Sequence, residues 1–215
     1  MLTGIILLGI LATFGMTKLL SRTLLRGVPS SFTLELPPFR RPQVGQVLLR
    51  SVCDRTLFVL GRAVTAAAPA GLLLWLMANL TVDGCSLLSL CAAFLDPFAR
   101  LMGLDGVILI AFILGLPANE IVIPIILMAY LSQGTLQAPT SLAAMRELFL
   151  ANGWSSVTAL CTMLFSLMHW PCATTLITIK KETGSRKWTA LAAVLPTLCG
   201  MAACMLVNAV GSLFL

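Results

Sequence analysis

The stretch Gly115-Leu116-Pro117-Ala118-Asn119-Glu120 interrupts an apolar run that extends over residues 106–131. A run of this length is sufficient to cross a bilayer as one helix. Proline, however, removes a backbone donor, and glycine and asparagine favour helix ends. The sequence therefore predicts two short helices with a break between them at membrane depth. Non-helical backbone is tolerated there only where protein or a water-filled cavity surrounds it.

Composition excludes a water-soluble enzyme. Hydrophobic residues make up 59% of the 215-residue chain and charged residues only 10%, whereas a soluble domain carries roughly 25% charge. Aromatic residues are 7%, with a single tyrosine, which does not fit the aromatic girdles of an outer-membrane barrel. We therefore expect an all-α fold, a polytopic helical membrane protein with broken or re-entrant helices.

The basic residues favour a membrane topology over nucleic-acid binding. The net charge is +6, and eight of the fourteen Lys and Arg residues lie between Lys18 and Arg62, with four more between Lys180 and Lys187. Both clusters flank apolar runs, as the positive-inside rule predicts for cytoplasmic segments. We expect a multi-pass protein of the bacterial cytoplasmic (inner) membrane whose basic clusters contact anionic lipid.

Breaks in hydropathy divide the chain into eight segments. The predicted membrane helices cover residues 1–27, 48–81, 157–187 and 188–215, the third being interrupted at Pro171 and followed by a basic cytoplasmic loop. The predicted connections are a proline-rich interfacial segment at 28–47 and extracytoplasmic segments at 82–105 and 132–156, the last with a short helix near 142–150. The eighth segment is the broken or re-entrant pair at 106–131.

Two topologies are open for residues 106–131. If both basic clusters are cytoplasmic and residues 87–101 lie flat on the outer surface, the segment begins and ends on one side and forms a re-entrant hairpin. If residues 87–101 cross the membrane, the segment is one broken span. We favour the hairpin, with its tip at residues 116–120.

Glu120 is a carboxylate inside an apolar run, where a central charge costs ~2.5–3.5 kcal/mol on insertion scales. With Asn119 and the backbone carbonyls freed around Pro117, it would form an oxygen-rich cation site. Helix capping explains the same residues in part, because Asn119 could cap the second half-helix with Glu120 in its first turn. A cap alone does not require an intramembrane carboxylate, so we predict a transport role.

A second break is predicted at Pro171, which opens the turn at the Leu167 carbonyl. His169, the only histidine, and Cys172 are three residues apart and would share one face of a helix. Imidazole and thiolate suit borderline transition metals such as Fe(II). The alternatives are an interhelical hydrogen bond for His169 and simple packing for Cys172. With Glu120, these residues form the predicted metal-binding set.

Motifs for other chemistry do not occur in the sequence. There is no G-x-x-x-x-G-K-[ST] phosphate loop, G-x-S-x-G or H-E-x-x-H motif, so we expect neither a nucleotide site nor enzymatic activity in this chain. None of the seven cysteines has C-x-x-C spacing, which favours reduced thiols over a disulfide framework or structural zinc.

Three segments resemble the ferrous iron transport protein B (FeoB) family. Residues 32–40 (FTLELPPFR) resemble its F-x-x-E-L-P-P-[YF]-R stretch, and residues 115–122 (GLPANEIV) resemble its G-x-x-A-[KN]-E-[VI]-V segment. Residues 171–188 resemble its second gate motif, P-C-x-A-T followed by K/R-E-T-G-S-x-K-W, although Ala173-Thr174-Thr175 varies the usual order.

The resemblance implies the C-terminal half of the membrane domain of a bacterial Fe(II) importer, with Fe(II) as the transported ion. It implies Cys172 as the gate-motif position of the iron pathway and Glu120 as the acidic position. The family also carries a GTP-binding domain and a first gate region, so we expect these as partners, on the same split gene or a separate chain, and a homo-oligomer as a further assembly. Two other functions stay open: an ion-coupled carrier of an organic solute such as a nucleoside, and a non-transporting membrane scaffold.

Overall fold

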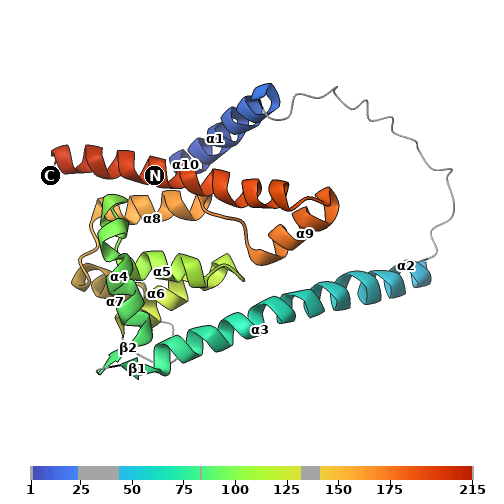
Figure 1. Ribbon diagram of the computed structural model, residues 1–215, viewed down its shortest axis with the longest axis horizontal. Helices are drawn as coiled ribbons and strands as arrows, with labels where there is room; N and C mark the ends of the chain where they lie inside the picture. Colours follow the sequence, from blue (N-terminus) through green and yellow to red (C-terminus); the bar gives the residue numbers. More distant parts are fainter. Residues whose placement is uncertain (1, 24–43, 83, 132–140, 215) are drawn as a thin grey trace. The chain divides into compact units, whose positions relative to one another are not determined.

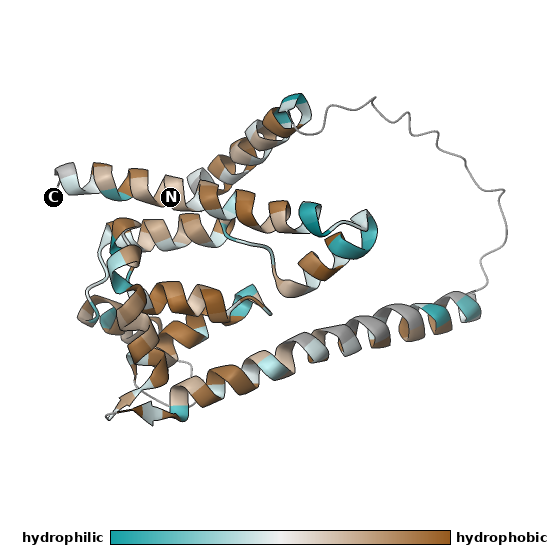
Figure 2. Ribbon diagram, in the orientation of Figure 1, coloured by the Kyte–Doolittle hydropathy of each residue, from teal (hydrophilic) through white to brown (hydrophobic). Residues whose placement is uncertain are grey.

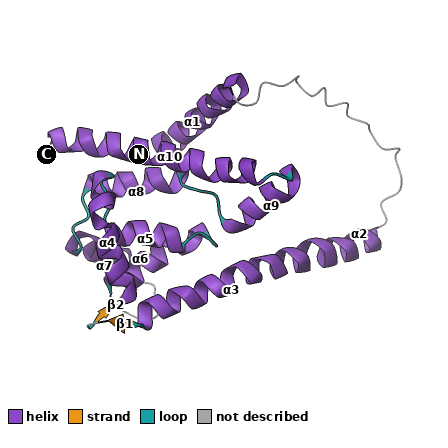
Figure 3. Cartoon of the chain, in the orientation of Figure 1, coloured by secondary structure: helices purple, strands orange, loops and turns teal. Residues whose placement is uncertain are grey.

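The computed structural model describes residues 2–23, 44–82, 84–131 and 141–214, and nearly all of them are helical (Figures 1 and 3). The all-α prediction is confirmed. The chain divides into two compact units, residues 1–60 and 61–215, which are described separately. The predicted connector at 28–47 lies mostly outside the described residues and the segment 32–40 wholly outside them, as do residues 132–140 of the connection at 132–156.

The first unit is built from apolar helices. Helix α1 covers Leu2–Thr23, α2 covers Val44–Arg50, and a π-helical segment, Ser51–Leu57, precedes α3, Phe58–Asn79. Polar side chains in α1 bond within the helix: Thr13 Oγ1 donates to the Gly9 carbonyl at 2.8 Å. Such back-bonding satisfies hydroxyl groups that lipid cannot, as a membrane helix requires.

The second unit begins at Gly61, so only the first residues of α3 belong to the first unit, and the second contains the rest of α3 and the remaining elements. They are β1 (Thr81–Val82), β2 (Cys85–Ser86), α4 (Leu87–Leu101), α5 (Gly106–Leu114), the short 3-10 helix η2 (Asn119–Ile121), α6 (Val122–Tyr130), α7 (Leu142–Ala151), α8 (Ser156–Met168), α9 (Ala173–Thr183) and α10 (Arg186–Phe214). The two strands pair antiparallel, with Thr81 opposite Ser86.

The core of this unit is centred on α5 and α6. Nearly every residue of α5 is apolar, and a helix that is apolar on all sides is stable only when it is surrounded. Its Phe112 ring meets Phe165 of α8 edge to face, with centroids 4.9 Å apart. In Figure 2, helices α5 and α6 are almost continuously hydrophobic. The fully buried large side chains are Phe112, Phe165, Met102, Ile108, Ile125, Ile126, Cys161 and Cys204.

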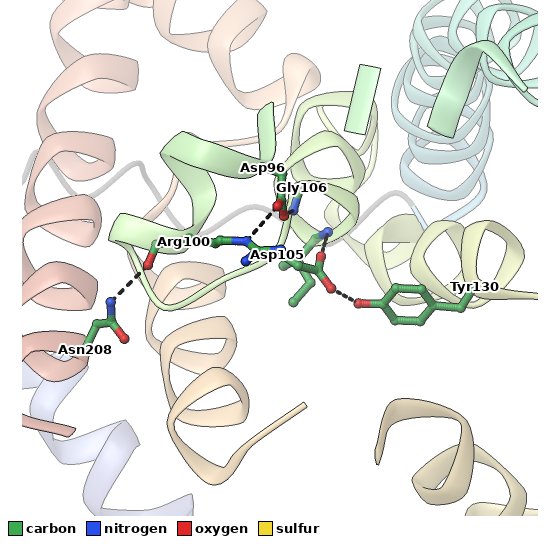
Figure 4. A network of polar contacts seen from close by, with 7 residues as sticks. Asp96, Arg100, Asp105, Gly106, Tyr130 and Asn208 are labelled. Carbon is green, nitrogen blue, oxygen red and sulfur yellow. Dashed lines mark hydrogen bonds and ion pairs between the residues drawn. The ribbon is translucent and has the colours of Figure 1, made fainter. Parts of the chain in front are cut away.

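Helices α5 and α6 form a hairpin whose two ends meet at Asp105 (Figure 4). Asp105 caps α5 by accepting a hydrogen bond from the Ile108 amide at 2.6 Å. Its other oxygen accepts a hydrogen bond from the Tyr130 hydroxyl, at the end of α6. Trp154 Nε1 in turn donates to the Tyr130 oxygen at 2.8 Å. The segment therefore returns to its starting point, which is the geometry of a hairpin and not of one extended span.

The start of α5 lies directly against α4, and the two helices are bent by 108°. Asp96 of α4 accepts from the Gly106 amide at 3.1 Å and from Arg100 Nε at 2.6 Å. A Cβ atom on Gly106 would lie 1.9 Å from the Ala92 carbonyl oxygen. The bend thus depends on glycine at this position, because any side chain would separate the helices.

Helices α8 and α10 pack along each other. Cys161 Sγ lies 3.7 Å from the Cys204 carbonyl oxygen, and Cys204 Sγ lies 3.3 Å from the Cys161 carbonyl oxygen. Near the end of α8, a Cβ on Gly200 of α10 would lie 3.1 Å from Met168 atoms. These close approaches fix the two helices side by side.

Several helices have the length and apolarity of membrane spans. In the described part of the chain these are Ile6–Thr23, Arg186–Ser212 and the segment Ser156–Thr183, which comprises α8 and α9, and the bent pair α4 and α5 passes the same criterion together. Residues Ala63–Asn79 form a shorter apolar helix. The chain is a multi-pass membrane protein.

Replacing Gly106 by alanine should lower the free energy of unfolding by about 3 kcal/mol or more, because the new methyl group collides with backbone. Unfolding by SDS of the protein in mild detergent, followed by helical circular dichroism, measures the change. The control is Gly71→Ala in α3, where a Cβ would meet no atom within 4 Å. That change should be neutral or stabilise by up to ~1 kcal/mol through helix propensity. Equal stability of the two variants would contradict the described α4–α5 contact.

Candidate functional site

The first predicted break lies between α5 and α6. Gly115 ends α5 and its amide donates to the Ala111 carbonyl at 2.8 Å. A Cβ on Gly115 would lie 2.5 Å from Val122 Cγ2, so the turn is tight. Pro117 has no amide proton to continue the helix. The chain resumes as η2 and then α6, and the predicted interruption of residues 106–131 is confirmed.

Asn119 and Glu120 lie in η2 at the tip of the hairpin, and both are exposed. The capping alternative is not realised for Asn119, because Ala118 occupies the N-cap position and makes no side-chain cap. Glu120 does lie in the first turn of η2. Among the residues that the structure describes, neither side chain has a recorded hydrogen bond or ion pair. Their oxygens therefore remain available to a ligand.

The second predicted break is wider than a proline kink. Helix α8 ends at Met168, residues 169–172 are not helical, and α9 begins at Ala173 (Figure 3). The expectation that His169 and Cys172 share a helix face is therefore wrong. His169 is the C-cap of α8 and Cys172 is the N-cap of α9. The physical reason is that Pro171 both lacks a donor and biases the preceding Trp170 toward extended backbone.

His169 closes the end of α8 with its own ring. Its Nδ1 lies 3.1 Å from the Phe165 carbonyl oxygen and 2.9 Å from that of Ser166. Because carbonyls only accept, Nδ1 carries the proton in this arrangement, and the lone pair of the neutral ring is on Nε2. Nε2 is buried and has no partner among the described residues, and the ring as a whole is 8% exposed. Phe112 packs against it, with centroids 5.0 Å apart.

Cys172 is half-buried at the first turn of α9. Its Sγ lies 3.1 Å from Thr174 Oγ1 and 3.2 Å from Thr175 Oγ1. The sulfur thus lies at the positive end of a helix beside two hydroxyl groups. At the other end, α9 stops at Gly184, whose φ of +63° is the left-handed conformation that glycine adopts without strain.

The two breaks meet through their backbones. The Ala173 amide donates a hydrogen bond of 2.8 Å to the Leu116 carbonyl oxygen. Leu116 lies in the break of the hairpin, and Ala173 is the first residue of α9. Segments that are distant in the sequence are therefore in direct contact at the positions where both helices are interrupted.

A cavity of about 290 Å³ adjoins this contact. It has one side chain from each break, Leu116 and Trp170, and is otherwise bounded by α9 and α10. Most of its lining is apolar, and Thr197 directs its hydroxyl to the Ala193 carbonyl at 2.7 Å. The remaining lining residues are Leu176, Ala193, Val194, Thr197 and Leu198.

The three predicted metal ligands do not form one closed coordination shell. Within the described ranges, no three His, Cys, Asp or Glu side chains lie close enough together to hold a metal ion. Glu120 is at the hairpin tip, Cys172 is beside the threonine hydroxyls, and His169 faces aromatic rings. The role of each residue stays a prediction.

Sequence reasoning missed two features of the site. The Leu116–Ala173 hydrogen bond joins backbone groups, which leave no mark on residue identity, although a proline two residues before a helix start indicates a free amide there. The Asp105–Tyr130 contact was also missed. Its signal was present, because Asp105 directly before an apolar run has the pattern of a helix N-cap.

Replacing His169 by alanine should lower the free energy of unfolding by about 2–4 kcal/mol, since the Ser166 carbonyl loses its donor and a cavity opens beside Phe112. Denaturant titration of the detergent-solubilised chain measures the loss. The matched control is Ser166→Ala, which retains the Ser166 carbonyl and removes an exposed hydroxyl, and it should change stability by no more than about 0.5 kcal/mol. If His169→Ala is as stable as the control, the ring does not cap α8.

Two family models match successive parts of the chain. Residues 60–186 match the Gate family model, described as nucleoside recognition, and residues 2–53 match the model of the ferrous iron transport protein B C terminus. No solved structure matches the chain.

Relatives are found in bacteria and archaea. The Fe(2+) transporter FeoB of Staphylococcus aureus (strain MSSA476) is 26% identical over 96% of this chain and 31% of its own length. That of Methanocaldococcus jannaschii is 26% identical over 97% of this chain, and that of Synechocystis is 28% identical over 88%. The chain spans about 31% of the length of the first two and 30% of the third. Because the Gate model covers more than half of its residues, the chain belongs to the Gate family, and its sequence is similar throughout to part of FeoB.

Proposed function

We propose that the chain forms the second gate half of a ferrous iron importer and supplies one wall of an Fe(II) pathway. The observation that carries the proposal is the contact between Leu116 and Ala173, which brings together two helix breaks that bear metal-capable side chains. The relatives, which are named as Fe(2+) transporters, support Fe(II) as the transported ion.

The hairpin tip would act first. The exposed Glu120 carboxylate and Asn119 amide oxygen would replace part of the hydration shell of Fe(II), as oxygen ligands at broken membrane helices do for other cations. Pro117 contributes by preventing α5 from continuing, so that Asn119 and Glu120 lie at an exposed tip. Because the Glu120 carboxylate has no fixed protein partner in the described residues, it can release water and bind an ion without breaking a contact within the protein.

Cys172 would receive the ion next, on the other side of the Leu116–Ala173 contact. Thiolate is a softer ligand than carboxylate and favours Fe(II) over Mg²⁺ or Ca²⁺. Pro171 supports this position by ending α8, so that Cys172 stands at the start of a new helix. His169 could take part only through Nε2, because Nδ1 is held by two carbonyls. Several weak positions suit transport, since an ion that is bound too tightly does not leave.

The proposal places the hairpin in the membrane as a re-entrant element, with both basic clusters in the cytoplasm and the protein in the bacterial inner membrane. Energy for import would come from a GTP-binding domain with a first gate region, on the same or another chain. The relatives are about three times as long as this chain, which supports such a partner. A homo-oligomer that completes the pathway is part of the same proposal.

An ion-coupled nucleoside carrier is the competing function, and the description of the Gate model mentions nucleoside recognition. The match of residues 2–53 to the FeoB C terminus and the names of the relatives favour iron. The apolar lining of the cavity beside Leu116 also offers few partners to a polar nucleoside.

Equilibrium binding of Fe(II) to the purified chain in lipid nanodiscs, under anaerobic conditions, tests the proposal without a partner protein. Glu120→Ala and Cys172→Ala should each weaken binding at least about tenfold, which corresponds to the loss of about 1.4 kcal/mol. Excess nucleoside should not displace the metal.

The matched controls are Glu147→Ala, at an exposed position of α7, and Cys91→Ala, at a half-buried position of α4. Both should bind Fe(II) as the unchanged protein does. Binding that is unaffected in Glu120→Ala and Cys172→Ala would reject the site, and nucleoside binding in place of Fe(II) would favour the carrier.

A further inference from the structure

Each helix break leaves backbone groups without helical partners, and the two breaks satisfy each other. The first amides of a helix have no acceptor within it, and the last carbonyls have no donor. Ala173 holds the first amide of α9, and Leu116 holds a carbonyl just beyond the end of α5. Their hydrogen bond of 2.8 Å joins a donor from one break to an acceptor from the other.

We propose that the Ala173–Leu116 hydrogen bond is a latch that holds the gate closed. The proposal rests on the proposed function of the two breaks as an ion pathway. While the latch is made, the positive end of α9 points at the Leu116 carbonyl oxygen, and a cation approaching that oxygen is repelled. When the latch opens, the same oxygen becomes a ligand, and the start of α9, with the half-buried Cys172 directly before it, is released from the hairpin.

The surroundings of the latch allow movement at the tip and restrict it at the base. Asp105, Tyr130 and Trp154 fasten the base of the hairpin through consecutive hydrogen bonds. At the tip, Leu116 borders the 290 Å³ cavity. Because this apolar space is an open groove, Leu116 can shift into it without displacing packed side chains.

We expect the hydrogen bond to favour the closed state over the open state by only a modest factor. A hydrogen bond of this kind contributes little net stability because its partners can find others, and its removal changes an equilibrium by roughly 2- to 13-fold. A latch of this strength holds one state in the majority and can still be opened by an ion that competes for the carbonyl.

Ala173→Pro removes the latch and little else. Residue 173 is the first of α9, where proline is well tolerated because the amide has no helical partner. Cys172 already has φ −59° and ψ 157°, the extended backbone that a residue before proline requires. The matched control is Ala173→Ser, which retains the amide proton.

The rate of alkylation of Cys172 by a membrane-permeant maleimide measures opening in the full chain in lipid nanodiscs, with the modified peptide identified by mass spectrometry. Ala173→Pro should raise this rate roughly 2- to 13-fold over Ala173→Ser. Alkylation of Cys199, a half-buried thiol of α10, should be equal in the two variants. Equal rates at Cys172 would overturn the latch.

Two further measurements keep the outcome interpretable. Unfolding of Ala173→Pro would expose the buried thiols Cys161 and Cys204 to the reagent. In that case, amide hydrogen exchange of the unchanged protein tests the latch. The Ala173–Leu116 hydrogen bond predicts that the Ala173 amide is protected from exchange. Exchange of this amide at the unprotected rate would overturn the latch. Neither readout uses iron, so failure of Fe(II) binding would reject the proposed function while leaving the latch intact.

Discussion

Main-chain groups that a helix break releases inside an apolar layer must find partners within the protein, and the second unit is organised around this requirement. The Ser166 carbonyl of α8 is satisfied by the ring of His169, the carbonyl of Leu116 by the amide of Ala173, and the ends of the hairpin by Asp105. These three solutions fix the positions of both breaks. Without them, each unpaired backbone group buried in apolar surroundings would cost several kcal/mol.

The base and the tip of the hairpin differ in how they are held. At the base, charge-assisted hydrogen bonds from Tyr130 and the Ile108 amide converge on one carboxylate. At the tip, the contact to Ala173 is a single neutral hydrogen bond, and Asn119 and Glu120 are exposed. The strong interactions therefore lie away from the proposed pathway, and the weak one lies on it.

The sequence was sufficient to predict the helical membrane fold and both breaks, because proline, glycine and hydropathy act locally. It was not sufficient to predict the width of the second break, where Pro171 ends α8 at Met168 and separates His169 from Cys172. The function of His169 as a cap also went unseen, since the carbonyls it contacts belong to its own helix and become free only when that helix stops. The contact between Leu116 and Ala173 depends on tertiary placement, which residue types alone do not determine.

Helix α9 is bounded by the non-helical residues 169–172 on one side and by Gly184, with φ +63°, on the other. The helices before and after it, α8 and α10, are held to each other by the reciprocal contacts of Cys161 and Cys204. Helix α9 is therefore a short helix with a non-helical segment or turn at each end, between two helices that are packed against each other. A turn of α9 about these two ends would move Cys172 while α8 and α10 keep their contact, so a change in the proposed ion path requires the movement of one short helix only.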